Sequence, residues 1–410
     1  MTGPCPACQS PCVIRLIEKH GGYLSWVTHL RTLVRWAVAV VTVVHGLIHL
    51  LGAVKGFNWG IVSALKKPIG PAMGIVWLVA AVLMVATGAL LAASIRRWWL
   101  VGAFAVAASQ VAIVTSWSDA KVGTAANILV LAAVVYGAAA YGPTSFGTEY
   151  ERRVSVALVP HADETVVTEQ DLASLPEPVA AYIRQSGAIG QPHVANFRAT
   201  INGRIRANPS KPWMTFTGEQ VNSFGPNPSR SFHMDATMVG LPVDVLHIYA
   251  DAKAAMKVKL FALFPMVNAK GPKLDRAETV TVFNDLVVLA PGAIVGAPIA
   301  WTCIDNRHVS GTYTNGAQSV TGALTFNEEH ELVDFISNDR TAISSDSKTF
   351  TAQSWSTPIS AYRTTHGHRF AAVGEGHWHA APPIGEFAYI EFNVSNIDYN
   401  VGAQLHPASI

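Results

Sequence analysis

The sequence predicts an N-terminal four-helix transmembrane bundle followed by a C-terminal α+β domain with a strongly curved antiparallel sheet or half-barrel. Three observations lead to this fold class. Charged residues are scarce from Arg35 to Tyr141, where Ala, Val and Leu dominate. From about Glu149 onward the composition is that of an ordinary water-soluble protein. In this second part the hydrophobic period changes to two, which is typical of β-strands.

A chain of 410 residues is long enough for two or three units of ordinary domain size. The net charge of +2 provides no basic field, so we expect no nucleic-acid partner. The composition shifts along the chain predict an N-terminal tail at 1–31, a transmembrane domain at 32–142, a connector at 143–168, a soluble curved-sheet domain at 169–402 and a tail at 403–410.

Three of the four cysteines, Cys5, Cys8 and Cys12, lie in the first dozen residues, and Cys303 stands alone. This distribution shows no disulfide framework. The segment lacks an apolar region followed by a small-residue cleavage site, so we do not interpret it as a cleaved signal peptide. Thiolates at this spacing can converge on a soft metal ion. Because no fourth ligand is evident, we expect a disordered or reversibly acylated tail instead.

The first predicted span, 36–54, is a run of about 19 residues without formal charge, which is enough to cross the hydrocarbon core of a lipid bilayer. Three more spans are expected at 72–93, 98–117 and about 124–141. The links between them are short, which predicts that consecutive helices pack as antiparallel neighbours.

The distribution of basic residues predicts the orientation in the membrane. An internal N-terminus puts Arg15, Lys19, Arg31, Arg35, Arg96, Arg97, Arg152 and Arg153 in the cytoplasm and Lys55, Lys66, Lys67 and Lys121 outside. We therefore expect a multi-pass protein of the inner (plasma) membrane whose C-terminal domain is cytoplasmic. The opposite topology is the alternative.

Polar residues within the spans are costly in hydrocarbon and usually face the bundle interior. His45 and His49 are four residues apart, so they lie on one face of the first helix. One interpretation is a ligand pocket near the ends of the first, third and fourth helices, with the candidate residues His45, His49, Gln110, Trp117, Asp119, Lys121 and Asn127. The interpretation that we favour is that the histidines join the helices through hydrogen bonds to Gln110, Ser109 or a backbone carbonyl. A third interpretation is that they ligate haem or a metal. We expect no metal and no cofactor.

The soluble part is expected to begin with a short helix within 175–187, and a second, interior helix is expected at about Arg276 to Leu289. The segments with a strand-like period are 193–207, 213–224, 231–239, 243–264, 309–314, 319–326, 331–340, 359–365, 370–379 and 389–399. So many strands with so few helices predict a curved sheet with helices against its concave face.

Asp285 and Arg340 are the expected ligand-binding residues of this domain. One interpretation places them at the mouth of a cavity under the sheet, where each orients a polar group of a ligand. The other, which we favour, is a buried ion pair that locks the helix onto the sheet. The expected apolar lining comprises Phe216, Phe232, Met234, Val258, Leu260 and Phe326.

Four histidines, His366, His368, His377 and His379, lie in the segment HGHRFAAVGEGHWH. A hairpin turn through residues 374–376 would put two strands side by side without bringing the four imidazoles together. We therefore expect a solvated or partner-facing edge here rather than a metal site.

The segments VVHGLIHLLGAVKGF, SQVAIVTSWSDAKVGT, FNDLVVLAPGAI, FISNDR and SWSTPISAY resemble an uncharacterised family of bacterial four-helix membrane proteins with a C-terminal β-rich domain of unknown function. The resemblance covers nearly the whole chain. The membrane half is also similar in hydropathy to DoxX-like proteins, without a motif that carries their redox association. By analogy, the soluble fold resembles the curved-sheet lipid carriers of lipoprotein chaperones.

The sequence contains no nucleophile elbow, phosphate-binding loop, HExxH motif or dinucleotide fingerprint. We therefore expect a membrane-anchored protein that binds or presents a hydrophobic small molecule or lipid, isoprenoid-like molecules included. Two alternatives are an integral membrane enzyme with its chemistry in the helical pocket, and a scaffold for a protein partner. Whether the protein is an enzyme stays open at this stage.

Overall fold

The computed structural model describes the backbone of residues 11–158, 165–344 and 349–402, with side chains from residue 31 onward. The chain divides into two compact units between Ser145 and Phe146. Cys5 and Cys8 lie outside the described residues, as does the side chain of Cys12.

The N-terminal unit is helical. Its helices are α1 (Pro11–Gly56), α2 (Pro71–Ala92), α3 (Trp98–Thr115), α4 (Trp117–Ala120) and α5 (Gly123–Tyr141). Four stretches are long and apolar enough to cross a membrane, namely Arg31–Gly56, Pro71–Ala92, Trp98–Thr115 and Gly123–Ala157. The prediction of four N-terminal apolar helices is confirmed, but α1 begins much earlier than the apolar run, within the segment expected to be a tail.

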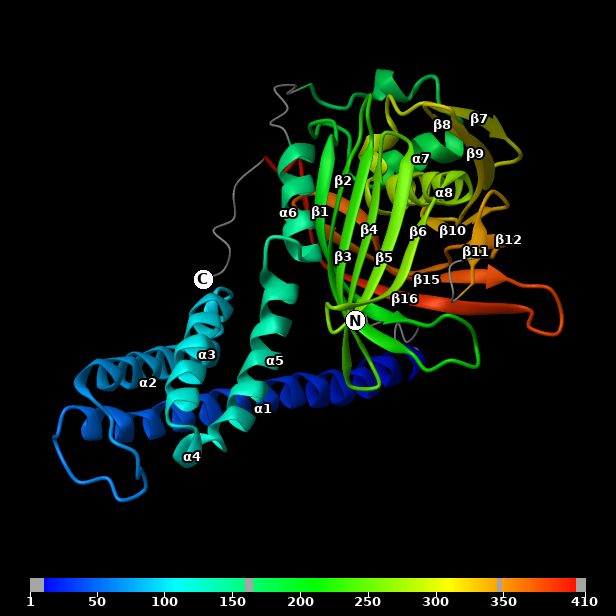
Figure 1. Ribbon diagram of the computed structural model, residues 1–410. Helices are drawn as coiled ribbons and strands as arrows, with labels where there is room; N and C mark the ends of the chain where they lie inside the picture. Colours follow the sequence, from blue (N-terminus) through cyan, green and yellow to red (C-terminus); the bar gives the residue numbers. More distant parts are fainter. Residues whose placement is uncertain (1–10, 159–164, 345–348, 403–410) are drawn as a thin grey trace, which may run out of the picture. The chain divides into compact units, whose positions relative to one another are not determined.

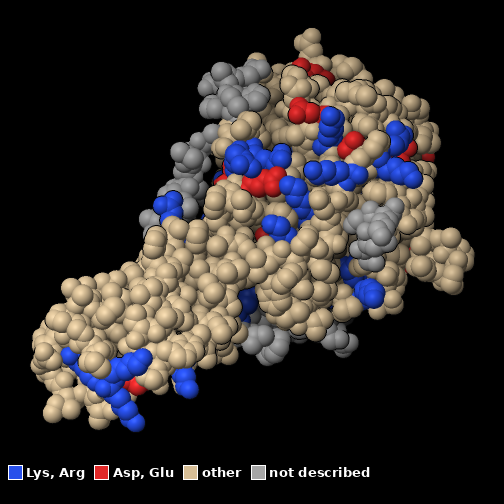
Figure 2. Space-filling view, viewed as in Figure 1, with Lys and Arg blue, Asp and Glu red and all other residues tan. Residues whose placement is uncertain are grey.

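Small residues let the helices of this unit approach closely, as is usual for helices that pack in lipid. A Cβ atom on Gly88 would lie 2.5 Å from Cγ2 of Val43, and one on Gly52 would lie 2.0 Å from the ring of Trp77. Figure 2 shows that the sides of this unit are almost free of charge and that basic side chains gather at the end where α4 and the α1–α2 link lie.

The C-terminal unit is built on a 14-stranded sheet. Its strands are β1 (Asn196–Ile205), β2 (Met214–Ser223), β3 (Ser229–Met238), β4 (Leu241–Ala250), β5 (Lys253–Leu260), β6 (Phe264–Lys270), β7 (Ile299–Cys303), β8 (His308–Asn315), β9 (Gln318–Phe326), β10 (Leu332–Ser337), β13 (Ser354–Ser356), β14 (Ile359–Thr365), β15 (His368–His379) and β16 (Glu386–Tyr399). The order is β6-β5-β4-β3-β2-β1-β16-β15-β13-β10-β9-β8-β7, with β14 paired to β15. A separate two-stranded sheet joins β11 (Thr341–Ile343) and β12 (Phe350–Ala352).

All pairings in the main sheet are antiparallel, and the sheet curves strongly without closing, as predicted. Helices α7 (Glu177–Gln185) and α8 (Pro272–Leu289) lie on its concave side (Figure 1). Two short 3₁₀ helices, Glu169–Leu172 and Pro291–Ile294, flank them in sequence. Tyr182 of α7 donates a hydrogen bond of 2.7 Å to the carbonyl oxygen of Val287, which ties the two helices together.

Helix α8 forms the centre of the core. Every residue from Ala277 to Leu289 is buried, including polar ones, because the sheet curves around the helix. Phe283 packs edge-on against Phe335 of β10 and stacks on Tyr313 of β8. The predicted interior helix is thus present, and it begins at Pro272, a favourable first residue for a helix.

Helix α6 (Phe146–Ala157) lies in the segment expected to be a connector. Its apolar residues Phe146, Tyr150 and Val154 pack with Leu246 and Ile248 of β4. Side chains alternate between the two faces of a strand. Leu246 and Ile248 therefore point away from the concave face, and α6 covers the convex face of the sheet.

The hairpin expected at residues 374–376 does not form, because His368–His379 is one continuous strand. The glycines instead make room for aromatic and branched side chains of the neighbouring strand. A Cβ atom on Gly374 would lie 2.8 Å from the ring of Phe392, and one on Gly376 would lie 2.6 Å from Ile390. The turn before β15 lies at His366 and Gly367, which both adopt a positive φ.

Candidate functional site

A cavity of about 120 Å³ lies between helix α8 and the concave face of the sheet. Its lining residues come from α8, from seven strands and from two segments beside strands. They are Ile201, Ile205, Phe216, Gln220, Arg230, Phe232, Met234, His247, Glu278, Thr281, Asn284, Asp285, Val288, Leu289, Arg340, Trp355, Thr357, Glu375, Gly376, Tyr389, Ile390 and Phe392.

The sheet supplies most of the apolar wall of the cavity. Phe216 of β2 and Phe232 of β3 meet edge to face, with ring centroids 6.2 Å apart. Ile201, Ile390 and Phe392 continue this wall along β1 and β16. Of the apolar lining expected from the sequence, Phe216, Phe232 and Met234 do line the cavity. Val258, Leu260 and Phe326 instead pack in or against the core.

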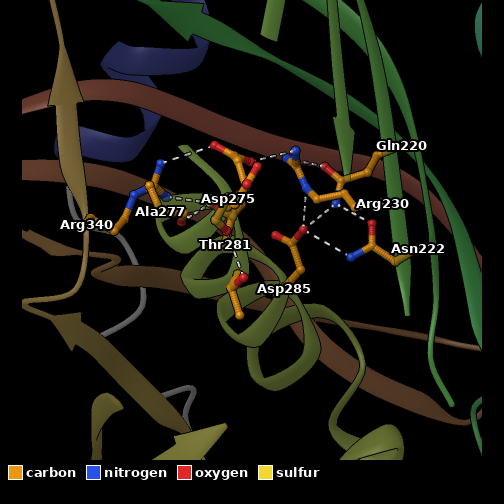
Figure 3. Close-up of polar contacts among 10 residues, drawn as sticks. Gln220, Asn222, Arg230, Asp275, Ala277, Thr281, Asp285 and Arg340 are labelled. Carbon is orange, nitrogen blue, oxygen red and sulfur yellow. Dashed lines mark hydrogen bonds and ion pairs between the residues drawn. The ribbon is translucent and has the colours of Figure 1, made fainter. Parts of the chain in front are cut away.

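The opposite wall is polar and centres on Asp285 (Figure 3). Its Oδ2 atom accepts hydrogen bonds from Arg230 Nε at 2.7 Å, Gln220 Nε2 at 2.8 Å and Asn222 Nδ2 at 3.1 Å. Gln220 and Asn222 are two residues apart on β2, so both point to the concave face. One carboxylate oxygen therefore joins α8 to β2 and β3.

A second polar group surrounds Glu278, which lies about two turns of α8 before Asp285. Its carboxylate lies 3.6 Å from Arg230 on one side and 3.6 Å from Arg340 on the other. Arg340 also donates a hydrogen bond of 2.7 Å to Thr281, and its guanidinium lies over the ring of Trp355, 4.4 Å from the centroid. Asp285 and Arg340 are thus not partners of each other, although each is in a buried ion pair and each lines the cavity.

Burial and neighbouring charges act together on the titratable groups of this wall. Burial acts to raise the pKa of Glu278, but the positive charges of the neighbouring arginines Arg340 and Arg230 outweigh burial, so this pKa is lowered. Burial raises the pKa of Asp285, although Arg230 opposes the change. Burial also lowers the pKa of His247 to about 4, so this imidazole is neutral at pH 7. Because Asp285 pairs with Arg230 and accepts two further hydrogen bonds, we describe the wall as two arginines facing two carboxylates.

Four polar atoms of the lining have no hydrogen-bond partner among the described residues, namely Asn284 Nδ2, Arg340 Nε, Trp355 Nε1 and Thr357 Oγ1. The four residues are 5%, 8%, 4% and 2% exposed. Buried polar atoms are almost always paired, so each exception calls for an explanation. Here all four belong to residues of one cavity, which indicates a site for a polar group.

The sequence contains a signal for this wall that was missed. Glu278, Thr281, Asn284 and Asp285 recur at three- and four-residue intervals in the mainly apolar segment from Glu278 to Leu289, so they share one face of the helix. Arg230, Gln220 and Asn222 lie far away in sequence, and only the folding of β2 and β3 over α8 brings them to Asp285.

The helical unit brings together some of the residues expected to form a pocket. His45 Nε2 lies 3.0 Å from Asn127 Oδ1, and His49 Nε2 lies 2.8 Å from Ser109 Oγ. Asn127 donates to Gln110 at 2.9 Å and accepts from Ser109 at 2.8 Å. The result is a buried network of hydrogen bonds that joins α1, α3 and α5.

The other three expected pocket residues lie apart from this network. Asp119 accepts hydrogen bonds from the backbone N–H groups of Lys66 and Lys67 at 2.5 and 2.8 Å, so it orders the link between α1 and α2. These contacts lower the pKa of Asp119, and the hydrogen bond from the backbone N–H of Lys67 contributes most. Trp117 is 49% exposed, and Lys121 is exposed as well.

The four histidines near residue 370 do not converge. His368 packs against Tyr399, with ring centroids 4.6 Å apart, whereas His377 lies between two carboxylates, 2.6 Å from Glu375 and 2.7 Å from Glu386. Within the described residues, no group of three or more His, Cys, Asp or Glu side chains could hold a metal ion.

The chain is similar in structure to a DUF1329 family protein from Desulfovibrio piger, with 13% identity, a TM-score of 0.32 and coverage of 55% of this chain and 92% of that one. It is also similar to a LolA superfamily protein from Nitrosomonas europaea, with 11% identity, a TM-score of 0.30 and coverage of 57% and 94%. No curated protein matches it. The profile of DUF6544, a family of unknown function, matches residues 165–392, more than half of the chain. The chain therefore belongs to the DUF6544 family.

Proposed function

We propose that this protein is a membrane-anchored binding protein that holds a hydrophobic molecule, lipid or isoprenoid-like, in the cavity beneath its curved sheet. The observation that carries the proposal is the division of the cavity into an apolar wall and a buried polar wall. Binding pockets for small molecules have this composition, with a mainly apolar lining and a few placed polar groups. The ligand is accordingly an amphiphile, with an apolar part against Phe216 and Ile390 and a polar end toward α8.

For the helical unit, we propose a role as an anchor in the inner (plasma) membrane, with the C-terminal unit in the cytoplasm. The support is the four apolar stretches, the bare sides of the unit and the gathering of charge at its end. The network through Asn127 favours anchoring over chemistry in this unit, because its polar groups bond to one another across three helices.

The test is mass spectrometry of the molecules that the full-length protein retains after purification in mild detergent. An Ile201→Trp variant fills the cavity, whereas Thr200→Trp adds the same side chain on the other face of β1. We expect a defined amphiphile with the wild type and with Thr200→Trp, and its loss with Ile201→Trp. Equal retention by all three proteins would contradict a ligand in this cavity.

A further inference from the structure

The polar wall of the cavity contains hydrogen-bond donors that have no acceptor in the part of the chain that the structure describes. Asn284 Nδ2 and Arg340 Nε can only donate hydrogen bonds, and neither has an acceptor among the described residues. Leaving a buried donor unpaired is energetically unfavourable, because the donor has given up its hydrogen bond to water. A group that fills this side of the cavity must therefore present an acceptor atom, which an oxygen supplies best.

The charges of the wall decide between a charged and an uncharged acceptor. The two buried arginines, Arg230 and Arg340, face two buried carboxylates, Glu278 and Asp285. Glu375 also lines the cavity, but its carboxylate binds His377 at 2.6 Å. An anionic group would thus add a charge without a counter-charge to a buried site, which is strongly unfavourable. An uncharged oxygen atom leaves the numbers of positive and negative charges in the wall equal.

The size of the cavity limits the group further. An apolar cavity of about 150 Å³ holds a benzene ring, and this one measures about 120 Å³. It therefore holds less than a whole substituted ring, namely the carbonyl group and the few carbon atoms next to it. The remainder of a longer ligand lies outside it.

We infer that the cavity recognises an uncharged carbonyl on an apolar body through donation from Asn284 Nδ2 and Arg340 Nε. This inference rests on the proposed binding function and specifies its ligand class. Two sources carry this chemistry, namely the acyl ester of a lipid and the ring of a quinone. Both place a carbonyl oxygen next to apolar atoms.

The experiment compares the affinities of three ring compounds of equal size for the full-length protein in amphipol. Each compound is titrated, and its binding is followed by saturation-transfer NMR. Acetophenone carries an uncharged carbonyl, isopropylbenzene has no acceptor and benzoate is an anion. We expect acetophenone to bind about tenfold more tightly than isopropylbenzene, since one hydrogen bond is worth about that factor. Benzoate should bind most weakly. Titrations with methyl hexanoate and tetramethylbenzoquinone then separate the ester source from the quinone source.

The decisive variant is Asn284→Leu, which removes a donor that has no partner to lose and keeps the side-chain size. We expect acetophenone to bind to this variant about tenfold more weakly than to the wild type. Isopropylbenzene should bind to the variant as tightly as to the wild type, or more tightly. General damage to the fold would weaken both. Arg340→Lys keeps the positive charge but lacks the Nε donor, so it should also weaken the binding of acetophenone. Asn393→Leu, on an exposed position of β16, is the matched control.

Two kinds of result overturn the inference. If isopropylbenzene or benzoate binds to the wild type as tightly as acetophenone, the carbonyl assignment is wrong while the binding function stands. The same holds if Asn284→Leu leaves the preference for acetophenone unchanged. If none of the probes binds, both the inference and the proposed function fail.

Discussion

Arg230 on β3 and Asp285 on α8 form an ion pair of 2.7 Å between Nε and Oδ2, and the two residues are only 6% and 8% exposed. The pair fastens the central helix to the concave face of the sheet. Desolvation of two such charges is costly, so the pair is weak evidence of net stabilisation. Its position on the cavity wall makes it part of the candidate site as well as of the fold.

Replacing one partner of this pair should destabilise the protein strongly. Arg230→Met leaves Asp285 as a buried charge without its cation, for which we expect a loss of about 3 kcal/mol in the free energy of unfolding. The double variant with Asp285→Leu should recover most of this loss. The measurement is thermal unfolding of the full-length protein in detergent, followed by circular dichroism.

Arg204→Met is the control for this variant, since the ion pair of Arg204 with Glu391 is more exposed. We expect a loss of at most about 1 kcal/mol there. If Arg230→Met costs no more than Arg204→Met, the pair does not hold α8 in place.

The β15–β16 pairing should be stronger at mildly acidic pH than at alkaline pH. Burial acts to lower the pKa of His377, but the hydrogen bonds that its ring donates to the carboxylates of Glu375 and Glu386 outweigh burial, so this pKa is raised. A raised pKa means that the contribution is fully present below the pKa of the unfolded chain, about 6.5. It is lost as the pH rises through the folded-state value.

The measurement is the melting temperature of the wild type and of His377→Gln between pH 6 and pH 9. We expect the variant to be less stable at the acidic end, by at most about 1 kcal/mol, and equal to the wild type at the alkaline end. His330→Asn, at an exposed turn, is the control and should not change the profile. A constant difference across the range would refute the link to His377.

The network in the helical unit should contribute to the association of its helices. Asn127→Leu removes the residue that bonds with His45, Ser109 and Gln110, and each of these groups then loses one hydrogen-bond partner in the bundle interior. We expect a loss of about 1–2 kcal/mol, the range found for interhelical hydrogen bonds in membranes. This loss in the free energy of unfolding is measured by unfolding the protein in mixed micelles of increasing SDS content.

Thr115→Val is the control for the network, because Thr115 bonds only to the backbone of its own helix. We expect little change in stability there. Equal stability of Asn127→Leu and the wild type would speak against a structural role of the network and in favour of the ligand-pocket hypothesis.

Gly374 should tolerate no side chain, although it lies in a regular strand. A Cβ atom there would meet the ring of Phe392 at 2.8 Å and the carbonyl oxygen of Pro358 at 2.9 Å. Gly374→Ala should therefore cost about 1–3 kcal/mol. Gly147→Ala, in α6 with its nearest neighbour at 3.6 Å, should be neutral or stabilising by about 1 kcal/mol, because alanine favours a helix. Chemical denaturation of both variants compares the two effects.

Much of the fold could be predicted because it depends on local patterns. The apolar runs that become α2, α3 and α5 are set by hydropathy and length. The interior helix α8 and most strands follow from a period of 3.6 or two residues. Helix α6 was missed because its segment carries mixed charges, and its apolar stripe is recognisable only against β4. The glycines of β15 suggested a turn, because a sequence does not show that an aromatic ring occupies the space above them.

Local sequence patterns are enough to predict that apolar helices precede a curved antiparallel sheet, and that Asp285 and Arg340 are buried charges in an apolar setting. The pairing of Asp285 with Arg230 and of Arg340 with Glu278, and the cavity that both pairs face, are visible only in the folded chain. The reason is physical. The periodicity of an element indicates which side chains share a face, whereas the partner across the core depends on how strands far apart in the chain curve around α8.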